Sequence, residues 1–129
     1  MSTTELSGLR VFVVEDESLI AMLIEDALET LDCTLVGVAS NLKDALDKAA
    51  ALNFDIAILD VNLNGQPVFP VAELLTARGV PMVFSTGYGA AGVPDAFAAA
   101  PVLGKPFEQP DIARALVAAR NGTGRIAPA

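Results

Sequence analysis

The spacing of apolar residues switches repeatedly between two patterns along this chain, and this alternation restricts the possible folds more than any other feature. Short uninterrupted apolar runs, typical of strands buried on both faces, alternate with segments in which apolar residues recur every three or four positions, as in helices. The predicted strands cover residues 9–14, 34–39, 55–60, 81–85 and 101–104. This alternation indicates an α/β fold with a doubly wound parallel sheet.

Helices are predicted over residues 19–31, 42–49, 71–78 and 109–120. Asn41 is expected to cap the second, since asparagine side chains accept hydrogen bonds from the first turn of a helix. The first helix starts at Glu17 and Ser18, with Ser18 as its expected cap. Residues 87–100 (GYGAAGVPDAFAAA) contain glycines and a proline, so a helix there is expected to be short, near residues 95–99, and mobile. About five helices therefore accompany the strands.

Size and charge limit the number of domains and the kinds of partner. The 129 residues fit one domain, which we place at residues 9–120, between a disordered N-terminus (1–8) and a flexible tail (121–129), with no effector domain. The 16 acidic residues outnumber the 8 basic ones and give a net charge of −8. Because no basic surface can neutralise phosphates, we expect no direct binding to nucleic acid or to an anionic membrane.

The chain contains no histidine, and Cys33 is its single cysteine. These counts exclude an internal disulfide, histidine-dependent nucleophilic catalysis, histidine-ligated zinc and a role as phosphohistidine donor. A signal peptide and a long apolar run are both absent from the sequence, so a cytoplasmic location is predicted. Any chemistry must come from carboxylates, hydroxyls, lysine or a bound hard metal ion.

Polar residues follow four of the five predicted strands. In open parallel sheets, ligands bind at the carboxyl ends of the strands, so these residues should meet at one edge. They are Glu15, Asp16 and Glu17 after the first strand, Asp60 and Asn62 after the third, Ser85 and Thr86 after the fourth, and Lys105 after the fifth.

The chemistry of this set favours phosphate and a divalent cation. Carboxylates without histidine suit Mg²⁺, which takes a few protein oxygens and shares the rest of its shell with water and phosphate. Lys105 and Thr86 offer the positive charge and the hydrogen-bond donor that match phosphate oxygens. Asp60 could act as a nucleophile and form an aspartyl phosphate. Taken alone, the acids could start a helix and the other residues could be ordinary surface groups, but their occurrence together favours a functional site.

Four short motifs resemble those of response-regulator receiver domains over nearly the whole chain, residues 9–120. They are VFVVEDE, ILDVNLNG, FSTGYG and GKPF. Each motif is weak alone, and the four together are highly specific. The resemblance implies a flavodoxin-like fold, in which a doubly wound five-stranded parallel sheet has the strand order 2-1-3-4-5.

The resemblance also implies a role for each matched residue. Asp60 would be the phosphoacceptor, and Thr86 and Lys105 would contact the phosphoryl group. The Lys105–Pro106 peptide bond is expected to be cis. The residues that would hold Mg²⁺ are Asp60, Asp16 (directly), Glu15 (through water) and Asn62 (through its backbone carbonyl).

The segments RGVPMVFSTGYG and PVAELL are similar to those of the "FATGUY" subgroup, which contains single-domain receivers of alphaproteobacteria. Such receivers are often paired with sensor kinases of the HWE/HisKA2 type. One departure concerns the switch, because receivers commonly carry an aromatic residue three positions before the lysine, where this chain has Val102. Tyr88, two residues after Thr86, is the switch candidate that would replace it.

We therefore expect a stand-alone receiver of a two-component phosphorelay. A sensor histidine kinase or a phosphotransfer protein would phosphorylate Asp60, and the receiver would then bind an unknown downstream protein or act as a phosphate sink. It would catalyse only its own phosphorylation and dephosphorylation. Three alternatives stay open. The first is a haloacid-dehalogenase-type aspartyl-phosphate phosphatase, which needs a second aspartate where Asn62 stands. The second is a flavodoxin-like cofactor binder, which needs a phosphate loop after the first strand. The third is a receiver-fold adaptor that is never phosphorylated.

Overall fold

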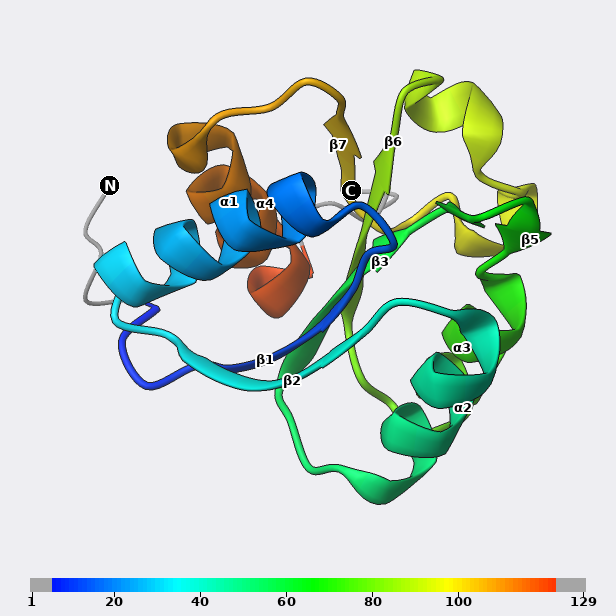
Figure 1. Ribbon diagram of the computed structural model, residues 1–129, viewed down its shortest axis with the longest axis horizontal. Helices are drawn as coiled ribbons and strands as arrows, with labels where there is room; N and C mark the ends of the chain where they lie inside the picture. The colour runs from blue at the N-terminus through cyan, green and yellow to red at the C-terminus, as the bar shows by residue number, and fades with distance from the viewer. Residues whose placement is uncertain (1–5, 123–129) are drawn as a thin grey trace.

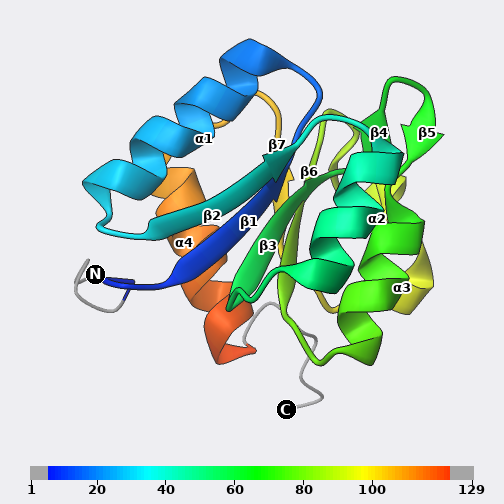
Figure 2. The ribbon, with the colours of Figure 1, turned by 60° about the horizontal axis from the view of Figure 1, so that its bottom comes forward.

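All five predicted strands form, and they lie in one parallel sheet with the order β2-β1-β3-β6-β7. The computed structural model describes residues 6–122, and Figures 1 and 2 show the sheet with helices on both of its faces. The strands are β1 (Arg10–Val14), β2 (Thr34–Ala39), β3 (Ile56–Asp60), β6 (Met82–Thr86) and β7 (Val102–Gly104). This arrangement confirms the predicted flavodoxin-like order 2-1-3-4-5.

Alternate side chains of strand β1 enter two separate hydrophobic cores, one on each face of the sheet. The helices are α1 (Ser18–Thr30), α2 (Leu42–Ala51), α3 (Phe69–Ala77) and α4 (Gln109–Asn121). Val11 and Val13 pack on the side of α1 and α4. Phe12 and Val14 pack on the side of α2 and α3. Figure 2 shows these two helix pairs on opposite faces of the sheet. Because the helices cover both faces, a ligand can reach the sheet only at the ends of its strands.

The starts of the first two helices follow different rules. Asn41 caps α2 as predicted, because its side chain accepts a hydrogen bond from the Asp44 N–H at 2.8 Å. The predicted cap of α1 was wrong. Ser18 is the first residue of that helix, and Glu17 occupies the cap position without a side-chain bond to the helix. The Glu17 side chain is therefore free to take part in contacts elsewhere.

Two short 3₁₀ helices, Gly89–Gly92 and Asp95–Phe97, stand in the connection between β6 and β7. The short helix predicted there is thus a 3₁₀ turn, and the described chain contains four α-helices. Glycine and proline lower helix propensity along the connection. The Phe97 ring packs on the sheet side, stacked on Phe69 with 5.7 Å between centroids and tilted against Phe84 at 5.8 Å. This aromatic cluster ties the connection to α3 and β6.

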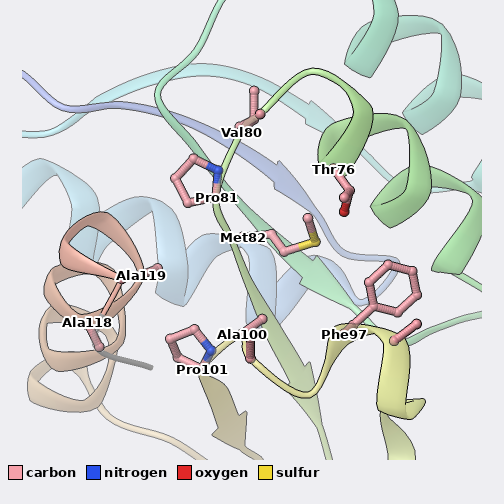
Figure 3. Close-up of a pocket in the computed structure, with 13 residues that line it drawn as sticks. Thr76, Val80, Pro81, Met82, Phe97, Ala100, Pro101, Ala118 and Ala119 are labelled. Atoms are coloured by element: carbon pink, nitrogen blue, oxygen red, sulfur yellow. The ribbon is translucent and has the colours of Figure 1, made fainter. Parts of the chain in front are cut away.

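A cavity of about 280 Å³ with an uncharged lining lies at the amino ends of β6 and β7 (Figure 3). Its walls come from the start of β6 at Pro81 and Met82, from Phe97 in the connection, and from Ala118 and Ala119 near the end of α4. None of the described residues that line it carries a charge. This end of the sheet is therefore suited to packing rather than to ionic chemistry.

The described fold extends slightly beyond the predicted domain boundaries of 9–120. Leu6 is fully buried on the side of α1 and α4, and Asn121 is the last residue of α4. The remainder of the predicted disordered N-terminus and flexible tail, residues 1–5 and 123–129, lies outside the described residues. Within the described part of the chain, no helix is both long enough and apolar enough to cross a membrane.

Candidate functional site

The residues predicted for the site meet in an open pocket of about 710 Å³ at the carboxyl edge of the sheet. Asp60 and Thr86 are the last residues of β3 and β6, and Lys105 follows β7 directly. Asp16, Asn62 and Tyr88 also line the pocket, whereas the predicted metal ligand Glu15 does not line it. These residues are distant in sequence, and they come together because neighbouring parallel strands end at the same edge.

Three carboxylates form a tight acidic group beside the pocket. One oxygen of each of Glu15, Asp16 and Asp60 lies within 4.8 Å of the others. Burial raises the pKa of Glu15 to about 8, and Asp60 contributes to this rise, while the Glu17 N–H and Lys105 act in the opposite direction. Burial also raises the pKa of Asp60. The group therefore retains a proton at neutral pH unless a further positive charge binds.

The acidic group fits a hard divalent cation. Glu15 is 2% exposed, and its Oε1 accepts no hydrogen bond from the described residues, although it lies 3.4 Å from Lys105 Nζ. A buried carboxylate oxygen without a donor is unfavourable, and a nearby cation would remove that penalty. Carboxylates beside an open pocket are the oxygen ligands that Mg²⁺ takes while it keeps part of its water shell.

Lys105 provides the positive charge of the pocket. Its Nζ lies 3.4 Å from Asp60 Oδ2 and 3.6 Å from Glu17 Oε1, in addition to the contact with Glu15. Burial acts to lower the pKa of Lys105, but Asp60 and Glu15 outweigh this effect and the pKa is raised. The lysine therefore stays charged at neutral pH. Its peptide bond to Pro106 is cis, as expected.

A small antiparallel hairpin, β4 (Asn62–Leu63) and β5 (Gln66–Pro67), forms the rim of the pocket. Its turn residues, Asn64 and Gly65, have φ angles of 51° and 89°, a region that asparagine and glycine tolerate best. The Asn64 N–H donates to Asp16 Oδ2 at 2.9 Å, so the hairpin orients one acid of the group. The sequence interpretation missed this hairpin, although Asn-Gly is the strongest short signal for such a turn.

Asn62 makes two contacts that bear on its predicted role. Its N–H donates to Asp60 Oδ1 at 3.3 Å, and its side-chain oxygen accepts from the Gly65 N–H at 2.6 Å. The side chain thus stabilises the hairpin turn. The backbone carbonyl of Asn62 is the group for which a metal role was predicted, and that role stays a prediction.

The Thr86 hydroxyl is held by the chain that follows it. Thr86 Oγ1 accepts a hydrogen bond from the Tyr88 N–H at 3.0 Å, and a Cβ added to Gly92 would lie 3.1 Å from the same oxygen. The Tyr88 side chain is 79% exposed, and Val102 packs against the core on the side of α2 and α3. The switch role of Tyr88 stays a prediction. Sequence reasoning did not find the close packing of Gly92, because it depends on the 3₁₀ turn.

Residues 11–117 match the family of response regulator receiver domains. The chain belongs to this family. It is 45% identical to SdrG from Sphingomonas melonis Fr1, whose solution structure it matches with a TM-score of 0.76 over 92% of this chain and 98% of that one. The BeF3-activated conformation of SdrG from Pseudomonas melonis Fr1 is 46% identical and gives a TM-score of 0.75, covering 88% of this chain and 98% of that one.

Among curated proteins, the receiver is 37% identical over 70 residues to a protein-glutamate methylesterase/protein-glutamine glutaminase of Methanosarcina acetivorans. The match covers 54% of this chain and 18% of that protein, so the chain spans less than a fifth of that relative. The similarity therefore concerns a small part of that protein. The narrower assignment to the "FATGUY" subgroup stays a prediction.

Proposed function

We propose that this receiver is a phosphorylation-dependent switch that accepts a phosphoryl group on Asp60. The observation that carries the proposal is the position of Asp60 Oδ2, 3.4 Å from Lys105 Nζ at the wall of an open pocket. Two further carboxylates and the Thr86 hydroxyl lie at the same edge. A carboxylate in this setting is a competent nucleophile for an aspartyl phosphate.

In the proposed transfer step, an Asp60 oxygen forms a bond to phosphorus while the bond from phosphorus to the donor atom breaks and leaves its electron pair on the donor. Lys105 neutralises charge on a phosphoryl oxygen. The Thr86 hydroxyl donates a hydrogen bond to a phosphoryl oxygen, which is compatible with the hydrogen bond that it accepts from the Tyr88 N–H. The chain thus contributes mainly positioning and charge compensation.

The residues that would hold Mg²⁺ are Glu15, Asp16, Asp60 and, through its backbone carbonyl, Asn62. When bound, the ion supplies positive charge that offsets the accumulation of negative charge during phosphoryl transfer. The unsatisfied Oε1 of Glu15 supports this assignment.

The proposed donor is a phosphohistidine on a sensor histidine kinase, of the HWE/HisKA2 type if the subgroup prediction holds, or on a phosphotransfer protein. The proposed output is altered binding to a downstream protein, or removal of phosphoryl groups from the kinase as a phosphate sink. Its own phosphorylation and dephosphorylation are the only catalysis we propose. The activated conformation of the related SdrG, obtained with BeF3, supports a two-state receiver.

Intact-mass measurement tests the proposal. The protein is incubated with Mg²⁺ and acetyl phosphate, and wild type is expected to gain one phosphoryl group, while Asp60→Asn and a chelator-treated sample gain none. Asp47→Asn is the matched control, since Asp47 is a surface aspartate on α2 that makes an ion pair with Lys43 outside the pocket. An adduct that persists in Asp60→Asn, or wild type that takes no phosphoryl group, contradicts the proposal.

A further inference from the structure

Glu17 is an acid of the pocket that the proposed metal site does not use. It lines the pocket together with Asp16, Asp60 and Lys105, and its side chain is 62% exposed. It stands at the cap position of α1 but makes no side-chain hydrogen bond to that helix. Its Oε1 instead lies 3.6 Å from Lys105 Nζ. The carboxylate therefore faces the entrance to the pocket and does not cap the helix.

Glu17 also changes the charge that an incoming molecule meets. Among the described residues that line the pocket, Lys105 is the cationic side chain, and it is shared between Glu15, Asp60 and Glu17 at 3.4, 3.4 and 3.6 Å. The two buried acids belong to the proposed reaction site, while Glu17 faces solvent. A donor that binds in the pocket beside Asp60 therefore comes close to this exposed negative charge. An exposed pair such as Lys105–Glu17 adds little to stability, so its effect should be on the approach of charged molecules.

We propose that Glu17 selects phosphodonors by their charge and disfavours small donors that carry several negative charges. The proposal rests on the function proposed above and concerns its substrate range. With acetyl phosphate, the Asp60–phosphorus bond forms as the phosphorus–oxygen bond to the acetyl group breaks, and acetate leaves with the electron pair. With phosphoramidate, the phosphorus–nitrogen bond breaks, and the protonated nitrogen leaves as ammonia with the pair. Glu17 favours the second class because phosphoramidate carries less negative charge.

Simple Coulomb arithmetic sets the size of the effect. A unit charge at the pocket entrance, roughly 6–7 Å from a dianion in water, lowers the encounter rate about three- to tenfold at low ionic strength. For a monoanion at the same place the factor is about two- to threefold. Both factors approach one when the Debye length falls to about 3 Å in about 1 M salt.

The test compares Glu17→Gln with Glu29→Gln. Both changes remove one negative charge from an exposed glutamate at an end of α1. Glu29 lies near the opposite end of the helix, about 18 Å along its axis from Glu17, so its charge is far from the pocket. Rates of adduct formation are followed by intact mass with acetyl phosphate and with phosphoramidate, at Mg²⁺ concentrations that saturate each variant. The measurements are repeated in about 10 mM and about 1 M salt, where the Debye lengths are about 30 and 3 Å.

Glu17→Gln is expected to raise the low-salt rate with acetyl phosphate about three- to tenfold, to raise the rate with phosphoramidate less, and to lose both gains at high salt. Glu29→Gln should match wild type. Equal gains with both donors, gains that survive high salt, or no gain at all overturn the role of Glu17 while leaving phosphorylation of Asp60 intact. If wild type takes a phosphoryl group from neither donor, the proposed function fails and this proposal fails with it.

Discussion

The two ends of strand β6 border two pockets with opposite chemical character. At the carboxyl end, Thr86 borders a pocket with buried carboxylates and one lysine. At the amino end, Met82 borders a cavity whose described lining carries no charge (Figure 3). Packing of apolar side chains stabilises the second region, whereas the first buries charged groups at a cost to stability. Substitutions at the two ends should therefore change stability in opposite directions.

The largest effect is expected from Glu15→Gln in metal-free protein. The pKa of Glu15 is raised from 4.5 to about 8, so the folded state disfavours its charged form. The resulting loss of stability is absent below pH 4.5, grows as the pH rises and is complete above about pH 8. Glu15→Gln should therefore stabilise the protein by roughly 2–4 kcal/mol at alkaline pH and by much less in mild acid.

Urea unfolding with a chelator at pH 5.5 and pH 8.5 measures this difference, with Glu29→Gln as a control for the loss of one charge. If Glu15→Gln stabilised the protein equally at both pH values, the buried charge of Glu15 would not be the cause of the lower stability.

The opposite sign is expected at the apolar end. Phe97→Ala removes a half-buried ring that packs on Phe69 and Phe84 and lines the cavity, and it should destabilise the protein by roughly 1–3 kcal/mol. Phe97→Leu should lose less, because it keeps most of the apolar volume. Since no described charge lines the cavity, the loss should be equal at the two pH values. If the loss of stability in Phe97→Ala depended on pH, the two ends of the sheet would not differ in the way described above.

Mg²⁺ should reduce the loss of stability that the buried carboxylates cause at the carboxyl end of the sheet. Binding to the folded state alone stabilises it by about 1.4 kcal/mol when the free ion is at ten times its Kd. The stabilisation should be greater at pH 8.5 than at pH 5.5, because the ion competes with the proton that Glu15 holds below about pH 8. The stabilisation by Mg²⁺ should vanish in the double variant that combines Asp16→Asn and Asp60→Asn. Thermal unfolding with Mg²⁺ and with chelator gives the answer, and equal shifts in wild type and the double variant would exclude this acidic group as the binding site.

The smallest effect is expected from Gly92→Ala. The new Cβ would lie 3.1 Å from Thr86 Oγ1, and Thr86 is buried in the sheet and cannot easily move, so a loss of about 1 kcal/mol follows. Gly87→Ala is the matched control, because a Cβ at Gly87 meets no atom within 4 Å. The two unfolding free energies are compared directly. If both variants behave alike, the 3₁₀ turn does not hold the Thr86 hydroxyl in the way that the structure indicates.

The meeting of the site residues could be predicted from the local pattern, whereas the strand order was implied by the resemblance to receiver domains. Apolar runs marked the strands, and parallel strands deliver their last residues to one edge. The N-cap of α4 was missed, because Glu108 forms a reciprocal box with Asp111 where sequence rules look for serine, threonine, asparagine or aspartate.

Other features depend on contacts between distant segments, which the local pattern specifies incompletely. The stack of Phe97 on Phe69 joins residues 28 positions apart, and it becomes visible only when the β6–β7 connection folds back on α3. The approach of Glu17 to Lys105 likewise requires that β1 and β7 end at the same edge. Glu17 was interpreted as part of a helix start, because its neighbourhood in the sequence resembles one.

Chemical mapping of the phosphorylated residue tests the central claim most directly. After reaction with acetyl phosphate and Mg²⁺, borohydride reduction converts an acyl phosphate of aspartate to homoserine, and peptide mass spectrometry then locates it. The account predicts homoserine at position 60, and none when a chelator replaces Mg²⁺. Modification at Asp16 or Glu15 in place of Asp60, or modification of Asp60 that does not depend on the metal, would contradict it.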